Sequence, residues 1–109
     1  MALASVNRLR KERDITTVLR EGKTVRGSFF ILKVHQRSEK QGENRFATIV
    51  ASRVAGTSVV RNTIKRKTTE VFRSVQLPPR GLDITCSIKM VPGQGRYQEL
   101  QEALKGISR

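Results

Sequence analysis

A segment rich in Lys and Arg holds the most concentrated chemistry of this sequence. It runs from Val59 to Arg73 and carries five cationic side chains but one carboxylate, Glu70. Arg61 and Lys65 would lie one turn apart on a helix, where two like charges destabilise each other slightly. A solvated helix face usually interleaves both signs of charge. We therefore expect an anionic partner, with phosphate groups as the obvious candidates, to neutralise this segment.

An apolar stripe in the same segment predicts how the cations are presented. Apolar side chains recur on one side of a helix that turns about 100° per residue. That side consists of Val60, Ile64, Val71 and Val75. Ser58 is the expected N-cap, because its hydroxyl could accept a hydrogen bond from an amide of the first turn. The helix should therefore bury one face and expose a cationic one.

Residue types that enzymes use for catalysis are scarce. His35 is the only histidine and Cys86 the only cysteine, so neither a zinc site nor a Cys–His or Ser–His nucleophile is expected. The nine Asp and Glu residues are dispersed, whereas two-metal nuclease chemistry needs clustered carboxylates. We expect the chain alone to be non-catalytic, with no catalytic residue and no metal site, and Cys86 to be a small buried hydrophobe.

The charge balance points to a polyanionic partner. The sequence has 22 Lys and Arg against 9 Asp and Glu, a formal net charge of +13. Such a field favours a nucleic acid as the partner. No apolar run approaches the ~18 residues of a membrane span, and no apolar secretory signal is recognisable. A lone cysteine suits a reducing compartment, so we expect a cytoplasmic protein without a membrane partner. We expect one domain over 1–109, with 1–7 as a flexible arm.

The remaining periodicities predict the elements that position these residues. A short helix is expected from about Asp14 to Glu21, capped by Asp14 and closed by a left-handed Gly22. Strands are expected over 28–35, 45–52 and 82–90, and a last helix over 97–107. The first two strands would pair as a hairpin. This succession favours an α+β fold, a two-layer α/β sandwich with a small mixed sheet.

Alternation in the first strand separates two faces. The core face consists of Phe30, Leu32 and Val34. The other face consists of Phe29, Ile31, Lys33 and His35. Because this second face mixes apolar bodies with polar or cationic tips, it suits a half-exposed ligand surface. Partial cover by a helix would explain the same pattern.

Two motifs in the basic segment, RNTIKR at 61–66 and EVF at 70–72, are shared with a known family. In them the chain resembles the protein subunit of bacterial ribonuclease P, whose signature is a helix with Arg-Asn-x-x-Lys-Arg followed by Glu-x-Phe. The block NRLRK at 7–11, with Asp14 and Gly22, is similar to the family's opening block. The expected strands and last helix follow in the family's order, so the resemblance covers nearly the whole chain.

The resemblance implies a fold and a role. The fold would be αβββαβα with a left-handed βαβ crossover, against the usual right-handed rule. The protein would bind a catalytic RNA and the single-stranded 5′ leader of precursor tRNA, to assist hydrolysis that makes the mature 5′ end. Mg²⁺ would be held mainly by the RNA subunit and the substrate, without a dedicated protein site. No protein partner would be required.

Carried over by position, the resemblance nominates three groups of residues. The candidates for RNA-subunit contact are Arg61, Asn62, Lys65, Arg66 and Arg73. The candidates for leader binding are Ile15, Leu19, Phe29, Ile31 and Lys33. Additional basic contacts are expected from Arg8, Arg10, Lys11 and Arg53.

The chain departs from the family pattern at four positions. Ser52, Thr63 and Thr69 stand where Arg or Lys is frequent, which removes three expected phosphate contacts. Ile15 replaces the customary Phe, so leader binding through this position would involve less stacking.

Three other functions fit parts of the sequence. An RNA-binding protein of another ribonucleoprotein, such as a ribosomal protein, would share the charge but show no preference for precursor over mature tRNA. An autonomous nuclease is disfavoured by the dispersed carboxylates. A helix-turn-helix DNA-binding domain is disfavoured because no second short helix and tight turn accompany the basic helix.

Overall fold

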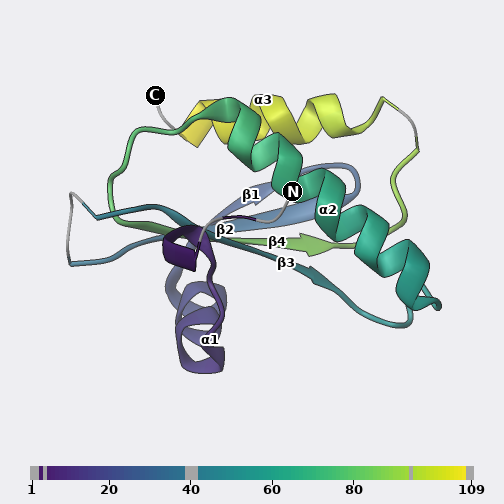
Figure 1. Cartoon of the computed structure of the whole chain (residues 1–109), viewed down its shortest axis with the longest axis horizontal. Helices are drawn as coiled ribbons and strands as arrows, with labels where there is room; N and C mark the ends of the chain where they lie inside the picture. The colour runs from purple at the N-terminus through teal and green to yellow at the C-terminus, as the bar shows by residue number, and fades with distance from the viewer. Residues whose placement is uncertain (1–2, 4, 39–41, 94, 108–109) are drawn as a thin grey trace.

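The computed structural model describes residues 3, 5–38, 42–93 and 95–107, in which a four-stranded sheet carries helices on both faces. α1 (Glu12–Glu21) lies against one face, and α2 (Ser58–Val75) and α3 (Tyr97–Ile107) cover the other (Figure 1). The element order is αβββαβα, preceded by a short 3-10 helix at Ser5–Asn7. This confirms the α+β class and the order that the family resemblance implied.

The sheet is mixed, and its strand order differs from the sequence order. Its order is β1-β2-β4-β3, with β4 antiparallel to β2 and parallel to β3. The strands are β1 (Lys23–Arg26), β2 (Phe30–Gln36), β3 (Arg45–Val50) and β4 (Leu82–Ile88). The predicted hairpin between the second and third of these strands is wrong, because β4 inserts between them. β2 instead forms a hairpin with β1, an element that the sequence patterns did not predict individually.

The chain crosses from β3 to β4 through α2. In Figure 1 it runs from left to right along β3, returns above the sheet through α2, and runs from left to right again along β4, which lies behind β3. This path is a left-handed crossover, the exception to the right-handed rule that the resemblance implied. α2 is thereby placed across the β3 side of the sheet, which it contacts directly.

The main core lies between the sheet and the α2–α3 layer. Strand registers place Leu32 beside Cys86 and Phe46 beside Ile84 on this face. All four side chains are buried, together with Leu100 and Leu104 of α3. The predicted period of the last helix is confirmed, since its apolar residues pack on this core.

α2 is rotated and capped differently from the sequence expectation. Thr57 is the N-cap, and its hydroxyl accepts a hydrogen bond from the amide of Val60 at 3.2 Å. Val60 was predicted in the core but is exposed, whereas Thr68 is fully buried. Thr68 can be buried because its hydroxyl lies 2.6 Å from the Thr48 hydroxyl and also donates within the helix. The prediction of the buried face considered only apolar residues, and it therefore missed this polar core position.

α1 begins earlier and ends differently than predicted. Its first residue is Glu12, and Lys11 rather than Asp14 occupies the cap position. Gly22 is extended, with φ −72°, and not left-handed. A Cβ at this glycine would lie 2.6 Å from the Val18 carbonyl oxygen and 3.1 Å from the Val34 amide nitrogen. Gly22 is therefore required for the close approach of α1 to β2.

The described part of the N-terminal segment packs against the domain and is not a loose arm. Leu3 is buried in the core, and residues 5–7 form the 3-10 helix. The Leu9 amide donates to the Phe46 carbonyl at 3.1 Å, which extends the β3 edge. Met1, Ala2 and Ala4, also predicted in the arm, lie outside the described residues.

Candidate nucleic-acid interface

A groove between the N-terminal segment and α2 joins two basic blocks that are far apart in the sequence. Its walls carry Arg8 and Arg10 on one side and Lys65 and Arg66 on the other, and its volume is about 630 Å³. We call it the basic groove. Four cationic side chains around one groove provide the positive charge that contact with a phosphate backbone requires.

Apolar residues form the floor of the basic groove. The floor includes Leu3, Leu9 and Phe46. The Phe46 ring stacks on Phe72 of α2 with centroids 4.6 Å apart. Arg8 is held in place because its Nε donates to the Leu3 carbonyl oxygen at 2.9 Å. The groove therefore rests on the hydrophobic core.

The other predicted cations of this surface have different settings. Arg61 is half-buried, and its guanidinium donates to the Ala55 carbonyl at 2.8 Å and the Ser58 hydroxyl at 3.3 Å. These two hydrogen bonds stabilise the turn before α2, so Arg61 has a structural role in addition to any contact with RNA. Asn62 is exposed on the same helix. Arg73 lines a second groove of about 560 Å³ that also includes Arg8, so it continues the cationic surface. Lys11 and Arg53 are exposed outside these grooves.

The face of the sheet that carries α1 forms a second surface. Strand registers align Ile31 with Ser87 and Ile49, and Lys33 with Thr85 and Ala47, on this face. We call it the open sheet face, and all of these side chains except the buried Thr85 are partly exposed. The Lys33 ammonium donates to the Thr24 hydroxyl at 2.6 Å, which directs it along the face.

α1 borders the open sheet face and contributes two predicted leader-binding residues. Val18 is fully buried and anchors the helix, while Leu19 is exposed and Ile15 is partly exposed. α1 contacts β2 and β4, so these side chains stand beside the strands that carry Ile31 and Lys33. Four of the five predicted leader-binding residues therefore lie on the α1 and sheet surfaces.

Phe29 is the exception, and its predicted place on the half-exposed face is wrong. It is 1% exposed, and its ring contacts Phe30 at 4.8 Å and Tyr97 of α3 at 5.6 Å. Phe29 precedes β2, so the alternation of the strand does not extend to it. Its side chain belongs to the core and cannot reach a ligand on the open sheet face.

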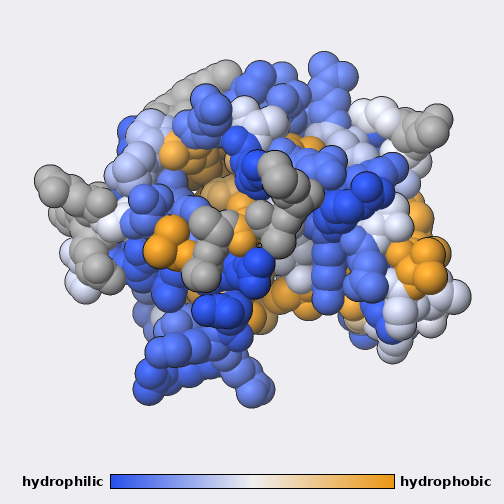
Figure 2. Space-filling model, viewed as in Figure 1, coloured by the Kyte–Doolittle hydropathy of each residue, from blue (hydrophilic) through white to orange (hydrophobic). Residues whose placement is uncertain are grey.

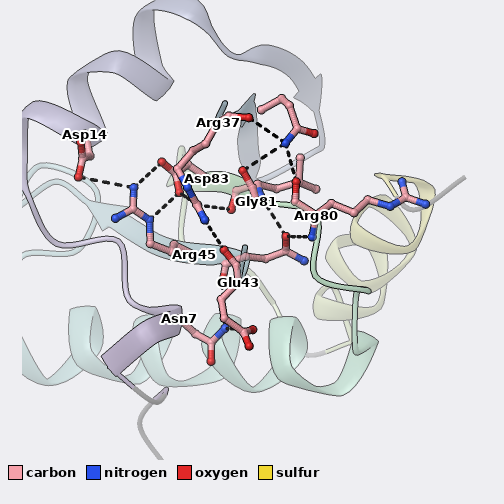
Figure 3. Close-up of polar contacts among 11 residues, drawn as sticks. Asn7, Asp14, Arg37, Glu43, Arg45, Arg80, Gly81 and Asp83 are labelled. Carbon is pink, nitrogen blue, oxygen red and sulfur yellow. Dashed lines mark hydrogen bonds and ion pairs between the residues drawn. The ribbon is translucent and has the colours of Figure 1, made fainter. Parts of the chain in front are cut away.

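An ion-pair network that the sequence patterns did not identify fixes α1 on the sheet. Arg45 lies between Asp83 of β4 and Asp14 of α1 (Figure 3). Arg37 also donates to the Asp83 carboxylate, which is almost fully buried. Asp83 was visible in the sequence as a charge inside an apolar strand, a signal that a buried carboxylate needs cationic partners.

Asn44 orders the loop that meets this network. Its side-chain oxygen accepts from the amides of Arg80 and Leu82, both at 3.0 Å, and its amide donates to the Pro78 carbonyl at 2.9 Å. The turn before β4 is thereby tied to the start of β3.

Cys86 in the core and Glu99 at the surface have shifted pKa values. Burial raises the pKa of Cys86 to about 12, so the thiol stays protonated, as predicted for a core residue. Hydrogen bonds from the Ser28 hydroxyl and amide lower the pKa of Glu99 at the surface. Within the described residues, no group of three His, Cys, Asp or Glu side chains could hold a metal ion.

The fold and these surfaces define the class: a small, strongly basic α+β domain with a cationic groove and a separate, partly apolar sheet face. The sequence model of the Ribonuclease P family matches residues 3–109. A Ribonuclease P protein component from Pseudanabaena sp. (strain PCC 6903) is 34% identical over 107 residues, covering 96% of this chain and 90% of the relative. One from Streptomyces avermitilis is 33% identical, covering 93% and 86%. The chain therefore belongs to the ribonuclease P protein family.

Solved structures of similar proteins share the fold. A mutant RNase P protein from Staphylococcus aureus superposes with a TM-score of 0.74 at 22% identity, covering 93% of this chain and 84% of that one. The RNase P protein from Thermotoga maritima superposes with a TM-score of 0.68 at 24% identity, covering 92% of this chain and 93% of that one. None of the helices in the described part of the chain is long and apolar enough to span a membrane.

Proposed function

We propose that this chain is the protein subunit of a ribonuclease P in which an RNA subunit is the catalyst. The protein binds that RNA and the 5′ leader of precursor tRNA, and so assists endonucleolytic maturation of the tRNA 5′ end. The observation that carries the proposal is the meeting of the N-terminal basic block with the motif helix around one groove. Family membership supplies the identity of the RNA.

The basic groove and the exposed side of α2 are assigned to the RNA subunit. Arg8, Arg10, Lys65 and Arg66 would bind phosphates, with Asn62 and Arg73 extending the contact along the helix. Binding of this kind releases counterions and weakens steeply with salt. Arg61 would contribute mainly by holding the turn before α2, since its guanidinium already has two partners.

The open sheet face and α1 are assigned to the leader. Ile15, Leu19 and Ile31 offer apolar contact to unstacked bases, and Lys33 offers one cation to the backbone. With Phe29 buried, the nominated apolar contacts at this surface, Ile15, Leu19 and Ile31, are all aliphatic. Aliphatic side chains contact any base without hydrogen-bond readout, so leader binding should depend little on sequence.

The chemistry would be supplied by the RNA and Mg²⁺. Mg²⁺ prefers phosphate and carboxylate oxygens and keeps several waters, so RNA subunit and substrate would hold it without a dedicated protein site. The protein's contribution would be positioning, in the cytoplasm, with no other protein required.

Precursor tRNA cleavage by the cognate RNA at low Mg²⁺ tests this function. Adding the protein should raise the cleavage rate or the substrate affinity, with a preference for precursor over mature tRNA. A protein of another ribonucleoprotein would show no such preference. If neither quantity changes on addition, the proposed function is wrong.

A further inference from the structure

An exposed apolar patch lies at the N-terminal end of α2, outside the lining of the basic groove and outside the open sheet face. Val59 is 75% exposed, Val91 51% and Met90 54%. Figure 2 shows one of several apolar areas of this face at the right-hand end, where α2 begins. Val59 and Val91 line one recess, and exposed apolar side chains that gather in this way are candidates for an interaction surface on a chain of net charge +13.

A small niche is recessed into this patch. It holds about 180 Å³ between α2 and the segment after β4, and its lining includes Val59, Val60, Val91, Pro92, Tyr97 and Lys67. This space is smaller than the ~300 Å³ at which pockets for drug-sized ligands begin. It suits one planar ring.

The niche offers the chemistry that holds such a ring. The Tyr97 ring forms part of the lining and is fixed by edge-on contact with Phe29, whose centroid is 5.6 Å away. The Lys67 ammonium lies 5.6 Å from the centroid of the Tyr97 ring, within cation–π range. An aromatic ring, apolar side chains and a cation at one recess are the elements of a base-stacking platform.

We propose that this niche takes one unpaired nucleobase of the RNA subunit, an inference that rests on the proposed function. α2 connects the niche to the basic groove, since Lys67 lines the first and Lys65 and Arg66 line the second. Successive residues of a helix point about 100° apart, so the niche and the basic groove lie on different sides of α2, and an RNA strand bound in the groove would reach the niche by passing round the helix. A second copy of the chain is a poorer occupant, because each copy carries +13 and the two would repel.

Two polar substitutions and a neighbouring control test the niche. Val59→Ser and Val91→Ser remove apolar lining from exposed positions, so folding should be preserved. Each should weaken binding of the cognate RNA subunit about fivefold, near the low end for loss of a base stack. The slope of log affinity against log salt should stay unchanged, because no phosphate contact is lost. Met90→Ser changes a residue that is about as exposed as Val91 but absent from the niche lining, and this variant should bind as wild type.

Two readouts on the assembled complex locate the base. Chemical probing of the RNA should show one unpaired nucleotide that wild type protects and that both niche variants release. Short-wavelength ultraviolet cross-linking followed by mass spectrometry should join that nucleotide to the peptide containing Tyr97, the only tyrosine.

The possible results distinguish failure of the niche proposal from failure of the proposed function on which it rests. If wild type does not bind the RNA subunit, the proposed function fails and the niche with it. If wild type binds but the two variants bind equally well with the same probing pattern, the niche assignment alone is overturned. It is also overturned if sedimentation shows a dimer that Val59→Ser dissociates, since a second copy would then occupy the patch.

Discussion

Arg45 of β3 holds Asp83 of β4 with two hydrogen bonds, from Nε and Nη2, each 2.7 Å long. The Asp83 side chain is 4% exposed, and the same Arg45 guanidinium lies 3.5 Å from Asp14 of α1. One arginine thus joins the two parallel strands and orients the helix that borders the open sheet face.

Replacing Arg45 by Met should lower stability substantially. The change leaves Asp83 buried with Arg37 as its remaining cation, and breaking a buried pair costs about 3–5 kcal/mol. Because Arg37 remains and Arg45 is partly exposed, we expect the free energy of unfolding, measured in urea, to fall by about 3 kcal/mol, the low end of this range. Arg20→Met is the control, since its pair with Glu21 is largely exposed and worth under about 1 kcal/mol. Equal effects of the two changes would contradict a structural role for Arg45.

Removing the Arg66 charge should change the salt dependence of RNA binding. Arg66→Ala should weaken binding to the RNA subunit and lower the salt slope by about one, as expected for a lost phosphate contact. Affinity measured across a salt series checks this. An unchanged slope would show that Arg66 does not neutralise a phosphate.

Adding a charge to the basic groove should have the opposite effect. Thr69 lines the groove together with Lys65 and Arg66, and it is partly exposed. Thr69→Arg should strengthen binding to the RNA subunit and raise the salt slope by about one. Thr69→Gln, of similar length but neutral, is the matched control and should leave the slope unchanged.

Truncating Leu19 should weaken leader binding without changing its dependence on salt. Leu19→Ala removes exposed apolar surface on α1 and should lower holoenzyme affinity for precursor tRNA several-fold, or about 1 kcal/mol. Mature tRNA affinity and the salt slope should not change. A loss shared by both tRNAs would place Leu19 outside the leader site.

Stability should depend on pH through Glu99. Its pKa is lowered in the folded state by hydrogen bonds from Ser28, so its contribution is present above the unfolded value of about 4.5 and is lost as pH falls through the lower folded pKa. Glu99→Gln should remove this part of the pH dependence in urea unfolding. Ser28→Ala should remove part of it, because the Ser28 amide still donates at 2.9 Å. Identical pH profiles for wild type and Glu99→Gln would refute the assignment.

Patterns within single segments of the sequence predicted the helices, because the apolar period of a helix lies within one segment. The last helix and the basic helix follow from the apolar period, and the charge pattern indicated the nucleic-acid surface. Strand pairing could not be predicted this way, because β4 reaches its place between β2 and β3 only after α2 has crossed the sheet. β1 has a single apolar residue, Val25, and is held by backbone pairing with β2.

The candidate site was predicted in part for the same reason. Exposed cations on α2 can be read from one segment, but the basic groove also needs Arg8 and Arg10, which reach it through pairing of the N-terminal segment with Phe46. Phe29 was misplaced because alternation was extended one residue beyond the strand. Thr68 was missed because its burial depends on a hydroxyl partner in β3.

The most direct test of leader binding measures the affinity of the cognate RNA subunit, alone and assembled with this protein, for precursor tRNAs of increasing leader length and for mature tRNA. The protein should raise the affinity for precursor tRNA in proportion to leader length until the open sheet face is filled, and it should leave the affinity for mature tRNA unchanged. An equal gain for precursor and mature tRNA, independent of leader length, would contradict leader binding by this protein.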